Sequence, residues 1–393
     1  MTEEQEKKPS QTSVLFERYM IFGVLILLIS ALWFRNPPLI FVSTFLLAIS
    51  VVILYWKRKS LDRLQPLMEL ERSRVFASDP ISVTCTLSND KWLPLVWVEW
   101  ELVDQDGIHW REMEKGPYII RFLWLMGYQR VNWKIEGQAL QRGVYSLGQI
   151  VLRSGDAFRF SETDLKVDLM KALYVYPALI PVSVPSLVHT FHWGTKGKKG
   201  GILEDATQIT GIREYQSGDE MRRMDWLASA RTGTLQTKVF QPVLPRQLMI
   251  AFDAAGFEVR EAGTYERVLS IIASVSLVYH QRGIEVGFTS NAAGRQVVYH
   301  PPSSKLNPLL DDLARIRVEN APIAGHLLKW IGANPTSILF YFCERVEESH
   351  VQWIRANSKR APYMMFYYLE ESDEGKRLEG QAKSIKSLQG GIG

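Results

Sequence analysis

Two uncharged apolar runs, separated by a pair of prolines, constrain this chain of 393 residues more than any other feature. The runs cover residues 19–34 and 39–56, and Pro37-Pro38 lies between them. As helices rising 1.5 Å per residue they would span about 24 and 27 Å, close to the ~30 Å hydrocarbon core of a bilayer. Because proline cannot continue a helix, the pair divides the apolar sequence into two antiparallel passes. We therefore predict a two-helix transmembrane hairpin over residues 19–56.

Basic residues flank the hairpin at its two outer ends, and only Arg35 lies between the runs. The flanking residues are Lys7, Lys8, Arg18, Lys57, Arg58, Lys59 and Arg63. Cytoplasmic segments carry such an excess of Lys and Arg. We therefore predict a multi-pass protein of the cell membrane with a cytoplasmic N-terminal tail (1–18) and a cytoplasmic body. A cleaved signal peptide is a rival interpretation of the first run, but a second run follows it without a small-residue cleavage site. A buried hairpin of a soluble protein is the other alternative.

Composition narrows the possible functions. The net charge of +4 is too small an excess to indicate a nucleic-acid partner, so none is expected. Two cysteines, Cys85 and Cys343, exclude a disulfide framework and a cysteine-rich zinc module. The expected partners are the lipid bilayer and another protein.

Residues 64–181 change to the two-residue alternation that is typical of half-buried strands. Many short β-branched or aromatic runs at close spacing predict an antiparallel β-sandwich. The candidate strands are 81–87, 95–103, 131–135, 143–151 and 173–176. Such a domain is expected to act as a spacer or docking surface.

Residues 182–242 are predicted to form a connection and then a charged motif. The basic, glycine-rich part at 191–201 has Lys199 where a phosphate-binding loop needs Ser or Thr, so a flexible link is expected rather than a nucleotide site. In the motif, arginines alternate with carboxylates and aromatic residues, which suits a bidentate ion-pair network. The residues of interest are Arg213, Tyr215, Gly218, Asp219, Arg222, Trp226, Ser229 and Arg231.

Two interpretations of this motif stay open. In the catalytic one, Ser229 is a nucleophile with Asp219 or Asp225 as its base, but no histidine lies between His192 and His280 and no Gly-x-Ser-x-Gly elbow is present. In the structural one, the charges form a clasp that holds two domains together. Asp219 is expected to cap the N-terminus of a short helix.

Residues 243–372 alternate between short apolar strands and helices of three- and four-residue periodicity. This order predicts an α/β domain with a mostly parallel sheet and helices on both faces. Ligands of such sheets bind beyond the carboxyl ends of the strands, where Asp253 and Glu344 are expected. Residues 373–393 are expected to be a flexible tail.

The charged motif resembles the signature of the DUF58 family, Gly-x-Arg-x-Tyr-x-x-Gly-Asp-x-x-Arg-x-x-x-Trp-x-x-Ser-Ala-Arg, at ten positions from Gly211 to Arg231. The resemblance implies a von Willebrand A-like C-terminal domain, whose metal site uses Asp-x-Ser-x-Ser. This chain reads Asp253-Ala254-Ala255-Gly256-Phe257 and lacks both hydroxyls. The resemblance also implies association with a MoxR-type AAA+ ATPase and with a transglutaminase-like membrane protein.

We therefore expect a membrane-anchored, non-catalytic scaffold that takes part in envelope protein assembly or maturation. No cofactor is expected, and Asp253 with Glu344 is only a weak candidate metal site. The alternative is a cell-envelope enzyme that acts on an anionic substrate through the arginine and aspartate cluster. A metal-dependent adhesion module is a third possibility.

Overall fold

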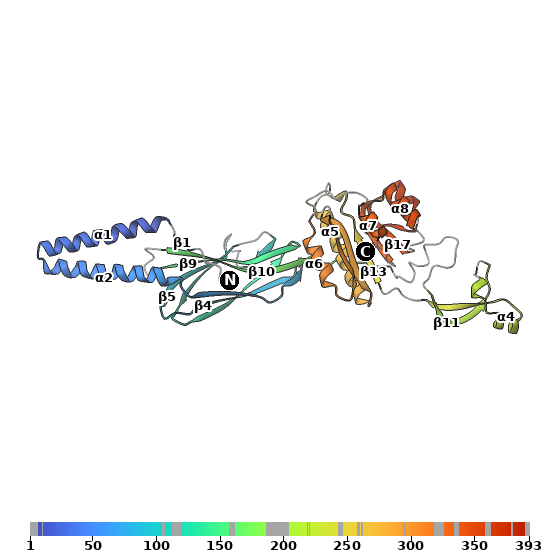
Figure 1. The fold of residues 1–393 in the computed structure, drawn as a ribbon, viewed down its shortest axis with the longest axis horizontal. Helices are drawn as coiled ribbons and strands as arrows, with labels where there is room; N and C mark the ends of the chain where they lie inside the picture. The colour runs from blue at the N-terminus through green and yellow to red at the C-terminus, as the bar shows by residue number, and fades with distance from the viewer. Residues whose placement is uncertain are drawn as a thin grey trace. The chain divides into compact units, whose positions relative to one another are not determined.

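The computed structural model shows a mixed α/β fold that divides into two units, Met1–Tyr176 and Pro177–Gly393. It describes residues 7–9, 11–103, 107–111, 119–156, 162–185, 204–217, 219, 221–242, 247–257, 260, 262–293, 296–317, 326–333, 338–357, 363–378 and 380–389. The boundary at Tyr176 lies a few residues before the predicted one. Figure 1 shows the helices and strands of both units.

The N-terminal apolar sequence forms helices α1 (Gln11–Trp33) and α2 (Pro37–Ser60). Asn36 caps α2 and accepts a hydrogen bond from Leu39 N. The second helix therefore begins at Pro37-Pro38, where the sequence predicts the break between the two helices. By length and composition α2 can cross a membrane, whereas the described apolar part of α1, Ile21–Trp33, is shorter. One of the two predicted spans is therefore supported by its length, and the two-pass arrangement stays a prediction.

Two sheets of the first unit pack over one core. Strands β2, β4, β8 and β6 form one sheet, and β1, β10, β9, β5 and β7 form the other, with β3 paired to β10. Trp100 and Trp133, one from each sheet, meet edge to face at 5.3 Å between ring centroids. The alternation of β4, with Ile81, Val83 and Cys85 buried, gives the sheet its inner face. The strands are β1 (Lys7–Pro9), β2 (Leu64–Leu70), β3 (Arg74–Phe76), β4 (Pro80–Asn89), β5 (Leu95–Leu102), β6 (Ile108–Trp110), β7 (Ile119–Leu125), β8 (Arg130–Ala139), β9 (Gly143–Gly155) and β10 (Glu162–Tyr176).

The second unit contains a six-stranded sheet in the order β15-β14-β13-β16-β17-β18, parallel except for β15. Alternate residues of its strands point to opposite faces of the sheet, and helices cover each face. On one face Tyr341 and Phe366 pack with α7 and α8, and on the other Phe340 and Phe252 meet Tyr279 and Tyr265 of α5. This confirms the predicted mostly parallel sheet with helices on both faces. Its elements are β13 (Gln247–Phe252), α5 (Ala262–Gln281), β14 (Glu285–Ala293), β15 (Gln296–Ser303), α6 (Asn307–Arg315), α7 (His326–Ala333), β16 (Ile338–Arg345), α8 (Glu348–Asn357) and β17 (Tyr363–Glu370).

The C-terminal segment differs from the prediction. Residues 373–393 were expected to be a flexible tail, but 373–389 contain α9 (Asp373–Arg377), β18 (Ala382–Ser384) and η4 (Ile385–Leu388). Ile385 and Leu388 are buried, and β18 adds a parallel strand to β17, so apolar burial and backbone pairing order this segment. Within the predicted N-terminal tail, β1 pairs with β10.

Candidate functional site

The charged motif lies in a hairpin made of β11 (Glu204–Glu214) and β12 (Gln236–Pro242), which we call the signature hairpin. The connection between its strands contains η2 (Met221–Arg223) and α4 (Trp226–Thr232). The connection returns to the sheet, because Met224 forms a bridge with Thr237 and Asp225 N donates to Gln236 O at 2.9 Å. Gly233 ends α4 in the left-handed conformation, at φ 71°.

Arg213 and Asp219 form a bidentate ion pair inside the hairpin. The two guanidinium nitrogens of Arg213 lie 2.7 and 2.8 Å from the carboxylate oxygens of Asp219. The Asp219 side chain is only 5% exposed and also accepts a hydrogen bond from Gln216 N at 3.0 Å. The hydrogen bond to Asp219 raises the pKa of Arg213. The pair therefore fixes the turn after β11, and both of its partners belong to one hairpin rather than to two domains.

The helix cap is a different residue from the one predicted. Asp225, not Asp219, caps α4 and accepts hydrogen bonds from Leu227 N and Ala228 N at 3.1 and 3.0 Å. Asp219 cannot fill that role because its carboxylate is taken by Arg213 and by the turn. The prediction of a capping aspartate was thus right in type and wrong in position.

Ser229 joins α4 to β12. Its hydroxyl donates to the carbonyl oxygen of Asp225 at 2.7 Å and accepts from Gln236 N at 2.8 Å. The side chain lies at the edge of burial, 9% exposed. The hydroxyl proton therefore points to a backbone carbonyl rather than to a carboxylate or an imidazole, which is the geometry of a structural hydrogen bond and not of an activated nucleophile.

The remaining motif residues face outward or lie outside the described residues. Arg222, Trp226 and Arg231 are exposed, Tyr215 is half-buried, and Gly218 lies outside the part of the chain that the structure describes. The signature hairpin exposes five large apolar side chains, and exposed apolar surface of this kind marks interaction sites. They are Met221 (62%), Trp226 (64%), Leu227 (65%), Leu235 (47%) and Ile212 (49%). Sequence reasoning chose Trp226 but did not include its apolar neighbours.

Asp253 lies where predicted, at the carboxyl end of β13, but its oxygens are engaged. Oδ1 accepts from Asn291 Nδ2 at 2.7 Å and from Ala255 N at 3.1 Å, and Oδ2 accepts from the Tyr341 hydroxyl at 2.5 Å. Asn291 in turn accepts from Ala254 N at 2.8 Å. Burial and the Asp253 carboxylate raise the pKa of Tyr341 well above its usual range, so the phenol stays a donor.

Glu344 is held by an arginine that the sequence did not point to. Arg260 donates to Glu344 and lies 2.5 Å from the carboxylate of Glu370 on the neighbouring strand. These hydrogen bonds, with Glu344 first and Glu370 second, raise the pKa of Arg260. Gly256, at φ 86°, passes so close to Glu344 that a Cβ would lie 3.0 Å from its carboxylate.

A divalent cation does not fit this pair of carboxylates. Asp253 faces three hydrogen-bond donors and Glu344 faces a guanidinium, whereas Mg²⁺ needs oxygen ligands around an open position. Among the described residues, no group of three or more His, Cys, Asp or Glu side chains is placed to hold a metal ion. At this edge of the sheet, the carboxylates of Asp253 and Glu344 are hydrogen-bonded to other groups of the protein.

The structure also buries a histidine that the sequence reasoning missed. His350 lies edge to face on Tyr341 at 5.4 Å, and its Nδ1 accepts from Glu347 N at 3.0 Å. Burial lowers the pKa of His350, and the neighbouring Asp253 opposes that change only in part. The imidazole is thus neutral at neutral pH. No local sequence pattern marks it.

Residues 211–326 match the family model described as "Protein of unknown function DUF58". Over these residues, which include the charged motif, the chain is similar to the DUF58 family. A curated relative, the uncharacterized protein YeaD of Bacillus subtilis (strain 168), is 24% identical over 222 residues, or 56% of this chain and 54% of that one. The chain therefore matches about half the length of this relative.

Likeness to solved structures is weak. The CARDB domain of a Pyrococcus furiosus protein is 10% identical, with 28% of this chain and 91% of that one covered and a TM-score of 0.19. The sporulation control protein Spo0M of Bacillus subtilis is 8% identical, with 46% and 68% covered and a TM-score of 0.15. Scores of this size carry no argument about the fold, so the DUF58 match is the informative comparison.

Proposed function

We propose that this protein is a membrane-anchored, non-catalytic scaffold whose signature hairpin binds another protein. The proposal rests on the observation that some residues of the charged motif stabilise the hairpin and others are exposed. Arg213, Asp219 and Ser229 are used in building the hairpin, while Trp226 and Arg222 stay exposed. Tryptophan, methionine and arginine are the residue types enriched at protein interfaces. A partner with an apolar groove rimmed by carboxylates would match them.

The anchor in this proposal is the helical hairpin of α1 and α2. Strand β1 precedes α1 and pairs with β10, and β2 follows α2 and pairs with β4. Because β1 and β2 belong to the same sandwich, the helices leave it and return to it, which supports a two-pass arrangement with both ends on one side. The excess of basic residues at these ends supports the cytoplasmic side.

The family supplies the expected partner class. We propose a MoxR-type AAA+ ATPase, with a transglutaminase-like membrane protein as a further member of the assembly, in the assembly or maturation of envelope proteins. The α/β domain would then be a degenerate von Willebrand A-like module. The closed contacts of Asp253 and Glu344 support a binding rather than a metal-dependent role.

The proposal is tested by measuring binding between the full chain in detergent micelles and a MoxR-type ATPase. The variant Trp226→Ser/Leu227→Ser is expected to weaken binding by about tenfold or more, as for loss of interface anchors. Leu140→Ser, which changes a side chain that is 54% exposed on the sandwich, is the matched control and should bind normally.

The proposal fails if the double variant binds as the unmodified chain does. It also fails if the purified chain alone turns over an anionic substrate and loses that turnover on Ser229→Ala. That second result would favour the enzyme hypothesis, for which the described geometry offers no specific support.

A further inference from the structure

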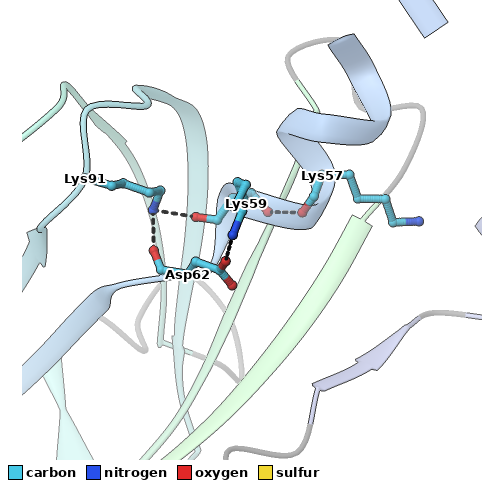
Figure 2. A network of polar contacts seen from close by, with 5 residues as sticks. Lys57, Lys59, Asp62 and Lys91 are labelled. Atoms are coloured by element: carbon cyan, nitrogen blue, oxygen red, sulfur yellow. Dashed lines mark hydrogen bonds and ion pairs between the residues drawn. The ribbon is translucent and has the colours of Figure 1, made fainter. Parts of the chain in front are cut away.

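A buried lysine joins the end of the candidate membrane helix to the sandwich. The ammonium group of Lys91, which is 6% exposed, donates to the carbonyl oxygens of Ser60 at 2.8 Å and Asp62 at 2.7 Å. Figure 2 shows this network, in which Lys59 also pairs with Asp62 at 3.1 Å. A cation at the carboxyl end of a helix satisfies carbonyls that have no partner within the helix and interacts favourably with the helix dipole. The β4–β5 loop is therefore joined to the last turn of α2.

A second loop is joined to the first. Asn89 Nδ2 donates to the carbonyl oxygens of Leu93 and Met126, both at 2.9 Å, and Tyr128 N donates to Lys91 O at 3.1 Å. Tyr128 has a positive φ of 58°, which a residue with a side chain adopts only where its surroundings hold it. The helix end and the two loops thus form one connected cluster.

This cluster carries a group of exposed aromatic and apolar side chains, which we call the interfacial residues. They are Trp92 (64% exposed), Trp124 (66%), Met126 (57%) and Tyr128 (74%). Trp92 lies in the β4–β5 loop, Met126 and Tyr128 lie in the β7–β8 loop, and Trp124 lies on the outer face of β7 just before that loop. Exposed apolar side chains of this size mark an interaction site. Tryptophan and tyrosine are the residue types that gather at membrane–water interfaces.

Their distance from the membrane follows from the helix. The apolar run of α2 ends at Trp56, and Ser60 is four residues further, or about 6 Å along the axis. The headgroup region is about 5–7 Å thick on each side of the hydrocarbon core. The hydrogen bonds of Lys91 to Ser60 therefore place the two loops at the depth of the headgroups when α2 spans the bilayer.

The charges near the two loops also favour contact with an anionic lipid surface. Lys57, Arg58 and Lys59 lie in the last turn of α2. Two further exposed basic residues lie by the loops: Arg63, whose carbonyl oxygen accepts a hydrogen bond from Asp90 N at 3.1 Å, and Arg130, which begins β8 directly after the second loop. Basic residues beside a membrane helix attract anionic headgroups, at about 1 kcal/mol each near the surface. At the end of a membrane helix, exposed aromatic side chains with basic residues beside them match an anionic lipid surface.

We infer that the end of the sandwich from which α2 leaves is a membrane-contacting surface, with the interfacial residues in the headgroup region of an anionic bilayer. This inference rests on the proposed function, since α2 must span the membrane. It adds that the sandwich is held at the membrane by its loops as well as by the helix.

The test uses the full chain in vesicles of phosphatidylcholine and phosphatidylglycerol. A single environment-sensitive fluorophore is attached at Trp92→Cys, Tyr128→Cys, Leu140→Cys or Phe45→Cys, all exposed positions, and lipids with nitroxide on the headgroup or acyl chain serve as quenchers. The native chain is the labelling blank, because Cys85 and Cys343 are buried. Tyr128 precedes β8 and Leu140 follows it, so the two positions lie at opposite ends of a ten-residue strand that spans about 30 Å.

The expected result is a loss of fluorescence at positions 92 and 128 with the headgroup nitroxide, a loss at position 45 with the acyl-chain nitroxide, and none at position 140. Quenching at position 45 with none at 92 or 128 overturns the inference and leaves the anchor intact. No quenching at position 45 overturns the anchor itself, and with it the proposed function.

Discussion

Replacing Asp219 by alanine should loosen the signature hairpin without unfolding either unit of the chain. The change removes both hydrogen bonds from Arg213 and the one from Gln216 N. Arg213 is left partly in water, because its side chain is 40% exposed. The loss is therefore local to the turn after β11, and we expect this turn to open more often.

The magnitude follows from the exposure of the two partners. A hydrogen bond to a charged group contributes about 1.5–3 kcal/mol when buried, and a fully exposed ion pair contributes about 0.2–1 kcal/mol. Asp219 is nearly buried and Arg213 is not, so the free energy of local opening should fall by about 1–2 kcal/mol. This corresponds to an opening equilibrium that is about 5- to 30-fold more favourable.

Amide hydrogen exchange measured by mass spectrometry detects such local opening. Peptides that cover residues 211–236 should exchange about 5- to 30-fold faster in Asp219→Ala, and peptides from β4 and β13 should not change. Arg222→Ala is the matched control, because Arg222 is exposed in the same connection. In the double variant with Arg213→Met, the second substitution should add little, because the two side chains share one interaction.

A change in hydrogen exchange of less than about twofold in the hairpin would refute this expectation. A change of that size corresponds to a few tenths of a kcal/mol, which effects on the unfolded state alone can produce. An equal effect of Arg222→Ala would refute it as well, since it would show that position rather than the ion pair decides the stability. Either result would return Asp219 to the list of candidate functional groups.

Three further predictions follow from other contacts. Lys91→Met should increase hydrogen exchange in the β4–β5 loop by about tenfold or more, because it removes two hydrogen bonds of a buried ammonium. Gly256→Ala should destabilise the second unit by about 1–2 kcal/mol in denaturant titrations, through its left-handed backbone and the contact with Glu344, whereas Gly263→Ala, with open space around it, should not. Burial lowers the folded-state pKa of His350, so protonation of this side chain favours the unfolded state. The stability of the second unit should therefore fall as the pH decreases below about 6.5. Thermal melts between neutral and acidic pH should show a shallower dependence for His350→Gln.

Hydrophobic periodicity predicted much of the fold because burial follows it in most elements. In β4, buried and less buried residues alternate along most of the strand, and in α5 the residues chosen by three- and four-residue spacing include the buried Leu269 and Ile272. Strand β7 was missed because Phe122 and Trp124 are apolar on its outer face, which hides the alternation. That irregularity is itself informative, since Trp124 is one of the interfacial residues.

The polar contacts of the candidate sites could not be predicted from sequence patterns. Asp253 finds Asn291 and Tyr341 at 38 and 88 residues' separation. Arg260 reaches Glu344 across 84 residues. Spacing rules describe neighbours within one helix or strand, whereas these partners meet only when parallel strands end at the same edge of a sheet. The sequence therefore indicated where the carboxylates lie and left open what neutralises them.

The distribution of charge over the two candidate sites favours binding over chemistry. Asp219 and Glu344 each hold an arginine, and Asp253 holds a phenol and an amide, so a reaction at either place would first have to break these contacts. What the hairpin leaves exposed is Trp226 and its apolar and arginine neighbours. Stability and binding should therefore be separable. Substitutions of the engaged carboxylates should change hydrogen exchange, and substitutions of Trp226 or Leu227 should change partner affinity alone. A variant at Trp226 that lost stability as much as affinity would contradict the division.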